Sequence, residues 1–520
     1  MRQQLWHRLR HWQQTKPASL ALEDENQQVT WEQLPHLIET VTDALAPCGG
    51  QAVGLQLENG CPWVIVDLAL LSRGNPVVPL PSFFSQAQIS HVLNDANLQW
   101  LIVDQPPHWL QPALIQQQWS LPLGLSLIQL TPANSALLAS QSSRLGRGVA
   151  KVTYTSGTTG QPKGVMLSAT HQLRVAQALA DRLAPLGLQR HGCCLPLAVL
   201  LENVAGVYTA LWQGATVVIP ALSSQGWQQS RLVDWTQYLA TWVCFQPDSL
   251  IWLPAMLRHI VQQPDLSLLK DKLTAGVRFI AVGGGKVTSA LLQQAQHQGL
   301  PVYEGYGLSE CASVVALNTP FDNVPGSVGH LLPHLQAQCS AQGELILQGN
   351  TFLGYLGQPR SAKRSVCTGD LVRLSSSSRL TVYGRCKNTI VTSYGRNINP
   401  EWVEAEAEAY PTLQQFVLLG NEHMDLTALI FSTALEDDII HSLLALNKSL
   451  PDYAQVRRWL RLVEPMTVSN GLLTSNGRLR RQVIQERFQT DLMASNQSKL
   501  RMVPTTAITN NVAAVVGTDG

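Results

Sequence analysis

The sequence has little charge and no excess of either sign. Charged side chains make up 14% of the 520 residues, well below the usual ~25%. The 36 basic residues nearly balance the 35 acidic ones, which leaves a formal net charge of +1. A chain this neutral has no long-range attraction for nucleic acid or anionic lipid, so no nucleic-acid partner is expected. Its hydrophobic content of 45% excludes a disordered chain.

Metal-ligand spacings and long apolar runs are also lacking. The nine cysteines include no C-x-x-C pair and no zinc-like spacing with histidine, and their number is odd. This pattern argues against a disulfide framework or a structural metal and fits a reducing cytoplasm. The longest apolar run, Trp63 to Leu71, contains Asp67 and reaches half the ~20 residues of a membrane span. The sequence therefore predicts a cytoplasmic protein with no integral membrane segment.

Strands and helical periods alternate through the first part of the chain. Residues 54–104 read as strand, helix, strand, helix and strand, a pattern typical of a parallel sheet covered by helices. After a Pro/Ser/Gln-rich stretch at 105–148 the alternation resumes, which predicts a second α/β layer. The strands predicted for this layer include the apolar segments 215–219, 242–246 and 277–282.

Shorter strands and turns follow residue 320 and predict a small β-rich unit, with strands at 343–349 and 379–384. The expected fold class is α/β. It consists of a large N-terminal domain, with two α/β layers plus the small β-rich unit, and a small mobile α+β C-terminal domain. We expect the domains at 1–386 and 387–490. A disordered tail is expected at 491–520, because the last residues have no amphipathic period.

Residues 154–164, YTSGTTGQPKG, follow a predicted strand and combine three glycines, four hydroxyl side chains and one lysine. Backbone amides exposed by glycine, with hydroxyl groups and a lysine, predict a polyphosphate site. The loop is not a Walker loop, which needs glycine before the lysine and serine or threonine after it. Here Pro162 precedes Lys163 and Gly164 follows it, so a P-loop kinase or ATPase is disfavoured.

This loop resembles the signature loop of the adenylate-forming superfamily, which includes the acyl-CoA synthetases. Further motifs follow in that family's order, namely GGG at 283–285, YEGYGLSE at 303–310, TGD at 368–370, GRCKNTIVTSYGRNINPEWVEAEAE at 384–408 and NGLLTSNGRLRR at 470–481. The likeness covers residues 1–490, and LPLAVLLEN at 195–203 leans towards the long-chain fatty acyl-CoA synthetase branch.

The resemblance implies an acid-thiol ligase that uses ATP and Mg²⁺. Such an enzyme converts a carboxylic acid, here a fatty or lipid-like one, to an acyl-adenylate. It then transfers the acyl group to the thiol of CoA or of a phosphopantetheinyl acyl carrier protein. Arg457, Arg458 and Arg461 could meet an acidic carrier protein, or they could form only a solvated face.

The resemblance also implies roles for individual residues. Around the β- and γ-phosphates it places Thr155, Ser156, Gly157, Thr158, Thr159, Gly160 and Lys163. Around the adenosine and the α-phosphate it places Gly283, Gly284, Gly285, Tyr306, Gly307, Ser309, Asp370 and Arg385. In this reading Tyr306 stacks on adenine and Asp370 accepts hydrogen bonds from the ribose. Glu310 coordinates Mg²⁺, a hard cation suited to carboxylate and phosphate oxygens. The residues expected to be catalytic are Thr155, Lys163, Glu310 and Arg478.

Two further positions are implied in the C-terminal domain. Lys387 matches the hinge about which this domain rotates between the two half-reactions, a conformational role that requires no chemistry of the lysine itself. Gly395, next to Tyr394, would border the channel for the thiol acceptor after that rotation. An ordinary exposed turn is the alternative for this loop.

Two departures from the family pattern leave alternatives open. Arg478 stands where the family has a catalytic lysine, and a planar guanidinium does not replace a compact ammonium at a fitted site. The chain could therefore be an acyltransferase or half-reaction enzyme with impaired adenylation, or a non-catalytic nucleotide-binding subunit of a biosynthetic assembly. Val199 and Leu200 lie where relatives have histidine or an aromatic residue at the carboxylate end of the acid pocket. Plain core packing is the alternative for these two.

Overall fold

Contacts in the computed structural model divide the chain into a large N-terminal and a smaller C-terminal unit, which confirms that part of the expected fold class. The described residues are 1–131, 145–155, 162–228, 231–359, 365–391, 397–421, 424–474, 477–493 and 500–503. The larger unit comprises Met1–Tyr383 and Thr474–Arg478, and the smaller one Gly384–Leu473 and Leu479–Gly520.

The first sheet of the larger unit has eight strands in the order β21-β9-β8-β4-β3-β5-β7-β6. Its parallel part contains β3 (Val53–Gln56), β4 (Val77–Pro79) and β5 (Trp100–Val103), connected by α3 (Cys61–Arg73) and α4 (Gln86–Asp95). The alternation predicted for residues 54–104 is thus confirmed. The other strands are β6 (Ile115–Ser120), β7 (Ser126–Leu130), β8 (Lys151–Thr155), β9 (Lys163–Leu167) and β21 (Gly354–Tyr355).

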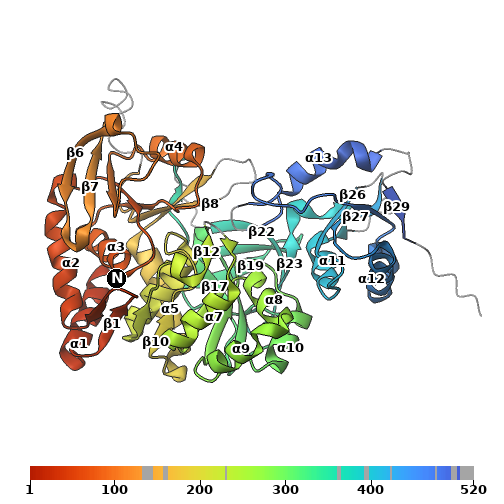
Figure 1. Ribbon diagram of the computed structural model, residues 1–520, viewed down its shortest axis with the longest axis horizontal. Coiled ribbons are helices and arrows are strands. Elements are labelled where there is room, and N and C mark those ends of the chain that lie inside the picture. The colour runs from red at the N-terminus through yellow and green to blue at the C-terminus, as the bar shows by residue number, and fades with distance from the viewer. Residues whose placement is uncertain are drawn as a thin grey trace, which may run out of the picture. The chain divides into compact units, whose positions relative to one another are not determined.

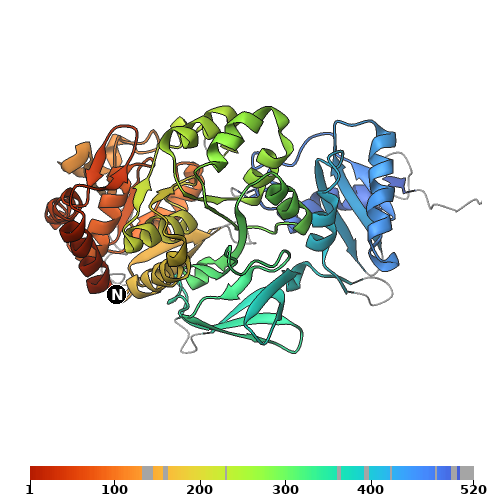
Figure 2. The same ribbon diagram turned by 90° about the horizontal axis from the view of Figure 1, so that it is seen from below.

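The second sheet has thirteen strands in the order β19-β20-β22-β23-β18-β17-β16-β15-β14-β10-β11-β1-β2. Their bounds are β1 (Leu20–Glu23), β2 (Gln28–Thr30), β10 (Arg190–Gly192), β11 (Thr216–Val218), β14 (Ser249–Trp252), β15 (Phe279–Val282), β16 (Val302–Leu308), β17 (Ser313–Leu317), β18 (Gly329–Leu331), β19 (Leu335–Cys339), β20 (Glu344–Gly349), β22 (Ser365–Leu374) and β23 (Arg379–Arg385). Pairing is parallel from β1 through β11, β10, β14 and β15 to β16. It is antiparallel between β1 and β2 at one edge, and in the pairs β16–β17, β17–β18, β18–β23, β19–β20 and β20–β22 towards the other. The expected β-rich unit is therefore the antiparallel end of this sheet, drawn in teal in Figure 2.

The prediction of a strand at residues 242–246 is wrong, because this segment is the end of helix α7 (Trp235–Phe245). The carboxylate of Asp234 caps the helix by accepting a hydrogen bond from the Gln237 backbone N–H at 2.8 Å. Tyr238, Leu239 and Trp242 are buried at helical spacing. A short apolar run cannot by itself distinguish a strand from a buried helix end.

Two cores lie on opposite faces of the second sheet. The first core fills the space between the two sheets, because it contains both Val53 of the first sheet and Val217 of the second. It is formed with α1 (Arg2–Thr15), α2 (Gln33–Ala44), α3, α5 (Ala169–Leu183), the π-helix η6 (Leu201–Tyr208) and α6 (Thr209–Gln213). The second core lies under α7, α8 (Pro254–Gln262), α9 (Ser267–Thr274) and α10 (Ser289–His297), which lie close together in Figure 1.

The smaller unit is built on a four-stranded sheet in the order β26-β27-β28-β29. Its strands are β26 (Gln415–Asn421), β27 (Met424–Phe431), β28 (Arg458–Arg461) and β29 (Leu500–Met502). Helices α11 (Pro400–Ala407) and α12 (Glu436–Ser449) share one core with the sheet, and α13 (Arg481–Met493) shares a different core with it. Figure 1 shows α13 on the other side of the sheet from α11 and α12.

The expected disordered tail at 491–520 contains regular structure in its first part. α13 runs to Met493, and β29 pairs with β28 at Leu460↔Leu500. Short strands can depend on long-range pairing that a search for local amphipathic periods does not detect. In the part of the chain that the structure describes, no helix is long and apolar enough to cross a membrane. All nine cysteines are free thiols.

Candidate active site

The predicted phosphate loop connects two antiparallel strands. Thr155 at the end of β8 pairs with Lys163 at the start of β9. Helix α4 contacts this hairpin next to the loop, where the Tyr154 hydroxyl donates to Asp95 Oδ2 at 2.8 Å and His91 Nε2 lies 3.0 Å from the Pro162 carbonyl oxygen. The loop residues Ser156, Gly157, Thr158, Thr159 and Gly160 lie outside the described residues.

Lys163 and Glu310, two of the predicted catalytic residues, meet at Tyr355. β21 pairs antiparallel with β9, which places Tyr355 opposite Val165. The Tyr355 hydroxyl donates to Glu310 Oε1 at 2.7 Å, and Lys163 Nζ lies 5.9 Å from the centre of the Tyr355 ring. Burial and the neighbouring carboxylate raise the pKa of Tyr355, so its hydroxyl remains a donor at neutral pH. The fold thus gathers one cation and one anion at the loop end of the hairpin.

Glu310 lies in a tight turn, η9 (Ser309–Cys311), between β16 and β17. A β-bulge falls between Tyr306 and Gly307, and a Cβ on Gly307 would lie 1.8 Å from the Ser313 carbonyl oxygen. Only glycine fits there. Ser309 is half-buried beside Glu310. The motif YEGYGLSE therefore owes part of its composition to this turn.

Tyr306 and Asp370, predicted to hold the adenosine, are brought together from different strands. The Tyr306 hydroxyl donates to Asp370 Oδ2 at 2.5 Å, and Asp370 is 4% exposed. The turn before Asp370 is held by the Gly369 N–H, which donates to Glu344 Oε1 at 2.9 Å. The carboxylate therefore has a fixed position beside the tyrosine.

The predicted glycine triplet, Gly283, Gly284 and Gly285, follows β15. A Cβ on Gly283 would lie 3.0 Å from the Gly305 carbonyl oxygen, so the loop runs close to β16, which carries Tyr306. Gly284 has a φ of +83°, a conformation that favours glycine. Arg478 belongs to the same unit and donates from Nε to the Gly284 carbonyl at 3.0 Å and from Nη2 to the same oxygen.

Three predicted residues belong to the smaller unit. Arg385 is the last residue of β23 and is half-buried. Lys387 is exposed in the turn η10 (Cys386–Asn388). Gly395 and its neighbour Tyr394 lie outside the described residues.

Val199 and Leu200, predicted for the acid pocket, immediately precede the π-helix η6. Val199 is half-buried and Leu200 is 6% exposed. In the helix itself, Leu201 and Ala205 pack against both large cores of this unit. π-Helical turns are rare and often mark functional sites.

Sequence reasoning missed Tyr355 and Glu304. Nothing in the local sequence marks Tyr355, because it reaches Glu310 only when β21 pairs with β9. Glu304 lies two residues before Tyr306 on β16 and is 6% exposed. Burial raises the pKa of Glu304 to about 8. A carboxyl at an alternate position of a buried strand is a signal that could have been noticed.

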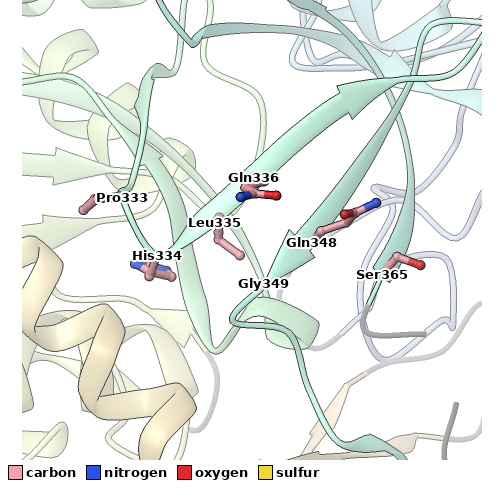
Figure 3. Close-up of a pocket in the computed structure, with 7 residues that line it drawn as sticks. All are labelled: Pro333, His334, Leu335, Gln336, Gln348, Gly349 and Ser365. Carbon is pink, nitrogen blue, oxygen red and sulfur yellow. The ribbon is translucent and has the colours of Figure 1, made fainter. Parts of the chain in front are cut away.

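A pocket of about 470 Å³ lies at the antiparallel end of the second sheet (Figure 3). Its lining residues are Pro333, His334, Leu335, Gln336, Gln348, Gly349 and Ser365. Gln336, Gln348 and Ser365 are cross-strand neighbours on β19, β20 and β22. No predicted site residue lines this pocket, so it is distinct from the site described above.

Comparisons with known proteins agree with this geometry. Residues 9–356 match the AMP-binding enzyme family, and residues 387–498 match the AMP-binding enzyme C-terminal domain. The long-chain-fatty-acid-CoA ligase FadD15 of Mycobacterium bovis is 26% identical over 83% of this chain and 86% of its own. The 2-succinylbenzoate-CoA ligase of Bacillus cereus is 25% identical over 78% of this chain and 83% of its own.

Solved structures share the fold. The o-succinylbenzoate CoA synthetase of Bacillus subtilis, in complex with its acyl-adenylate intermediate, aligns with a TM-score of 0.70. It covers 92% of this chain and 97% of the other at 19% identity. Fold and motifs together define an adenylate-forming enzyme of the acid-thiol ligase class. The chain belongs to the AMP-binding enzyme family.

Proposed function

We propose that this ligase activates a fatty or lipid-like acid with ATP and Mg²⁺ and transfers the acyl group to CoA. In the first step a carboxylate oxygen of the acid attacks the α-phosphorus of ATP, and pyrophosphate leaves. In the second the thiolate sulfur attacks the acyl carbonyl carbon, and AMP leaves. The observation that carries this proposal is the cluster of Lys163, Tyr355 and Glu310 beside the phosphate-loop hairpin.

In this proposal the cluster holds the polyphosphate. Lys163 is exposed at the mouth of the hairpin and supplies a positive charge to the β- and γ-phosphates, together with the Thr155 hydroxyl. Glu310 offers a carboxylate, and Mg²⁺ in phosphate sites is typically bound by one or two carboxylates plus phosphate oxygens. The donor set therefore fits the ion, which when bound would offset charge on the phosphates. Tyr355 orients the Glu310 carboxylate through its hydrogen bond.

The nucleoside end of the proposed site is formed by Tyr306 and Asp370. Asp370 accepts hydrogen bonds from the ribose hydroxyls, and the Tyr306 ring stacks on adenine while its hydroxyl holds the carboxylate. The Gly283 loop runs close to the strand that carries Tyr306, and in this proposal its backbone approaches the base.

An apolar acid is supported by the residues at the proposed pocket. Val199, Leu200, Leu201 and Ala205 offer only hydrocarbon, which favours an alkyl chain over a charged substituent. A long-chain fatty acid is the substrate named for the Mycobacterium bovis relative. The aromatic acid named for the Bacillus cereus relative is the main alternative to test.

CoA is favoured over a carrier protein as the acceptor. Arg461, one of the basic residues considered for a carrier, donates to the Ser432 and Ala434 carbonyls at 2.8 Å each. These two bonds use only two of the five N–H donors of the guanidinium, so the preference rests on the relatives, whose names give CoA as the acceptor. We further propose a domain boundary between residues 386 and 387, with β29 as the last strand of the C-terminal domain, Lys387 as hinge, Gly395 at the thiol channel and Arg385 near the ribose. Nine free thiols support a location in the cytoplasm.

ATP-pyrophosphate exchange with a panel of acids tests the proposed function. The panel contains saturated acids of increasing chain length, 2-succinylbenzoate and anthranilate, each with and without Mg²⁺. We expect exchange that requires Mg²⁺ and is fastest with an alkyl acid. Fastest exchange with an aromatic acid would contradict the substrate class. ATP binding without exchange would favour a nucleotide-binding subunit, and acyl transfer without ATP would favour an acyltransferase.

Asp370→Ala is expected to weaken ATP binding by at least about 10-fold, because the ribose loses hydrogen bonds to a charged acceptor. Isothermal titration calorimetry with ATP measures this loss. Tyr306→Phe is the matched control, because it removes the hydroxyl that donates to Asp370 and keeps the ring. It should change the affinity much less. Unchanged affinity in Asp370→Ala would place the ribose elsewhere.

A further inference from the structure

A lysine is buried at the start of the strand that leads into the phosphate loop. Lys151 opens β8 and is 2% exposed, and its partner Asp67 on α3 is 1% exposed. Lys151 Nζ lies 2.9 Å from Asp67 Oδ1 and 3.1 Å from Oδ2. Removing two charges from water costs several kcal/mol per ion, so a buried pair adds little net stability. Its presence in this core calls for another explanation.

The pair is tied to the π-helix η6 by two further side chains. Asn203 Nδ2 donates to Asp67 Oδ2 at 3.0 Å, and the Tyr208 hydroxyl donates to the same oxygen at 2.6 Å. Lys151 Nζ also donates to Asn203 Oδ1. Every one of these four residues is buried. The network therefore joins β8, α3 and both ends of the π-helix.

The same π-helix begins at the proposed acid pocket. The Asn203 backbone N–H donates to the Val199 carbonyl at 3.3 Å, so the residue that contacts Lys151 also contacts Val199. We call residues 195–200 the acid wall. Its other end is held by Asn59, which donates to the Leu195 carbonyl and accepts from the Leu197 N–H, both at 2.9 Å.

The buried side chain of Glu202 also supports the acid wall. Glu202 accepts from the Leu195 N–H at 2.9 Å through Oε2 and lies 3.0 Å from His191 Nε2 through Oε1. A Cβ on Gly206 would lie 2.3 Å from Glu202 Oε1, so the helix passes close to this carboxylate. The acid wall is therefore held from beneath by polar groups that do not themselves belong to it.

We propose that the Lys151–Asp67 pair is a positioning element that fixes the acid wall relative to β8 and thereby sets acid selectivity. This rests on the proposed function for the assignment of Val199 and Leu200 to the acid pocket. The physical reason is that hydrogen bonds depend on direction, whereas apolar contacts do not. Apolar packing between these elements would allow small shifts, whereas a four-residue hydrogen-bond network has one satisfied arrangement.

Tyr208→Phe is the most selective test, because it removes one hydroxyl and keeps the ring. We expect KM for the preferred acid to rise roughly 3- to 10-fold, the effect of about one hydrogen bond. KM for ATP should change less than about 2-fold, because no hydrogen bond to ATP is lost. The preference for one chain length of the acid should become weaker. The matched control is Thr216→Val, which also removes a buried hydroxyl, the donor to the Leu20 carbonyl at 2.8 Å. It should lower Tm without changing either KM.

Hydrogen-deuterium exchange separates this proposal from the proposed function. In Tyr208→Phe, residues 195–208 should exchange faster than in wild type, while Thr216→Val should leave them unchanged. If the wild type turns over no acid but this exchange pattern holds, the function fails and the positioning role stands. Unchanged exchange and unchanged acid KM in Tyr208→Phe, or an equal rise of both KM values, would overturn the positioning role.

A double variant tests the buried ion pair itself without leaving one of its charges alone in the core. Lys151→Met leaves the Asp67 charge buried without its cation, so unfolding of this variant would say nothing about the acid. The double variant Lys151→Met with Asp67→Asn removes both charges and keeps both shapes. We expect it to fold and to show the same selective rise in acid KM as Tyr208→Phe. A folded double variant with wild-type acid selectivity would also overturn the proposal.

Discussion

Replacing Glu310 with glutamine is expected to lower the rate of acyl-adenylate formation about 10²–10³-fold, the typical cost of losing one electrostatic contributor to a transition state. The amide keeps the shape of the side chain and can still accept from the Tyr355 hydroxyl. ATP affinity should therefore change little, because the loss concerns the metal at the developing charge. Single-turnover adenylation measured across a Mg²⁺ titration would show both effects.

The control for this variant is Glu25→Gln, a carboxylate that accepts from the Ala221 N–H at 3.1 Å and lies on no proposed site element. It should adenylate at the wild-type rate. Full activity of Glu310→Gln at every Mg²⁺ concentration would show that the metal is held by other residues.

Arg478→Ala is expected to slow adenylation at least about 10²-fold on the same reasoning. The guanidinium donates from two nitrogens to the Gly284 carbonyl, a fork that an ammonium cannot reproduce. We therefore expect Arg478→Lys to lose activity as well, though less than Arg478→Ala. Single-turnover kinetics of the first half-reaction measure both. The second, started from synthetic acyl-adenylate, should change little.

Arg480→Lys is the matched control, because Arg480 Nη1 also donates to a backbone carbonyl, that of Gly471, at 3.2 Å. It should leave both half-reactions unchanged. A faster first step in Arg478→Lys would instead show that arginine impairs adenylation. No effect of either substitution at 478 would mean that the catalytic position lies elsewhere in the C-terminal motif.

The sequence was most informative where function depends on short contiguous motifs. Thr155 and Lys163 flank one loop and are paired across the two strands that it connects. The two-layer α/β fold could also be predicted from the sequence, because residues 54–104 alternate clearly between strand and helix patterns. The contact between Tyr306 and Asp370 could only be implied through the family, since the two lie on separate strands.

Other features depend on pairing that no local pattern encodes. Tyr355 meets Glu310 through a two-residue strand docked on β9. Lys151 reads as one polar residue in a strand, and its partners come from two other elements, α3 and the π-helix η6. The error at 242–246 has the opposite cause, because a locally strand-like sequence was overridden by a capped helix.

The continuous second sheet has a consequence for how the chain can be divided. Because β17 pairs with β18 one strand beyond the change from parallel to antiparallel pairing at β16, a fragment ending after Leu317 would leave the outer edge of β17 without a partner. In the complementary fragment, the first strand would be β18, which would have lost its neighbour β17. Exposed edges of this kind attract other strands, so truncation between the two parts favours aggregation. Split or shortened versions of this enzyme are better cut outside the sheet.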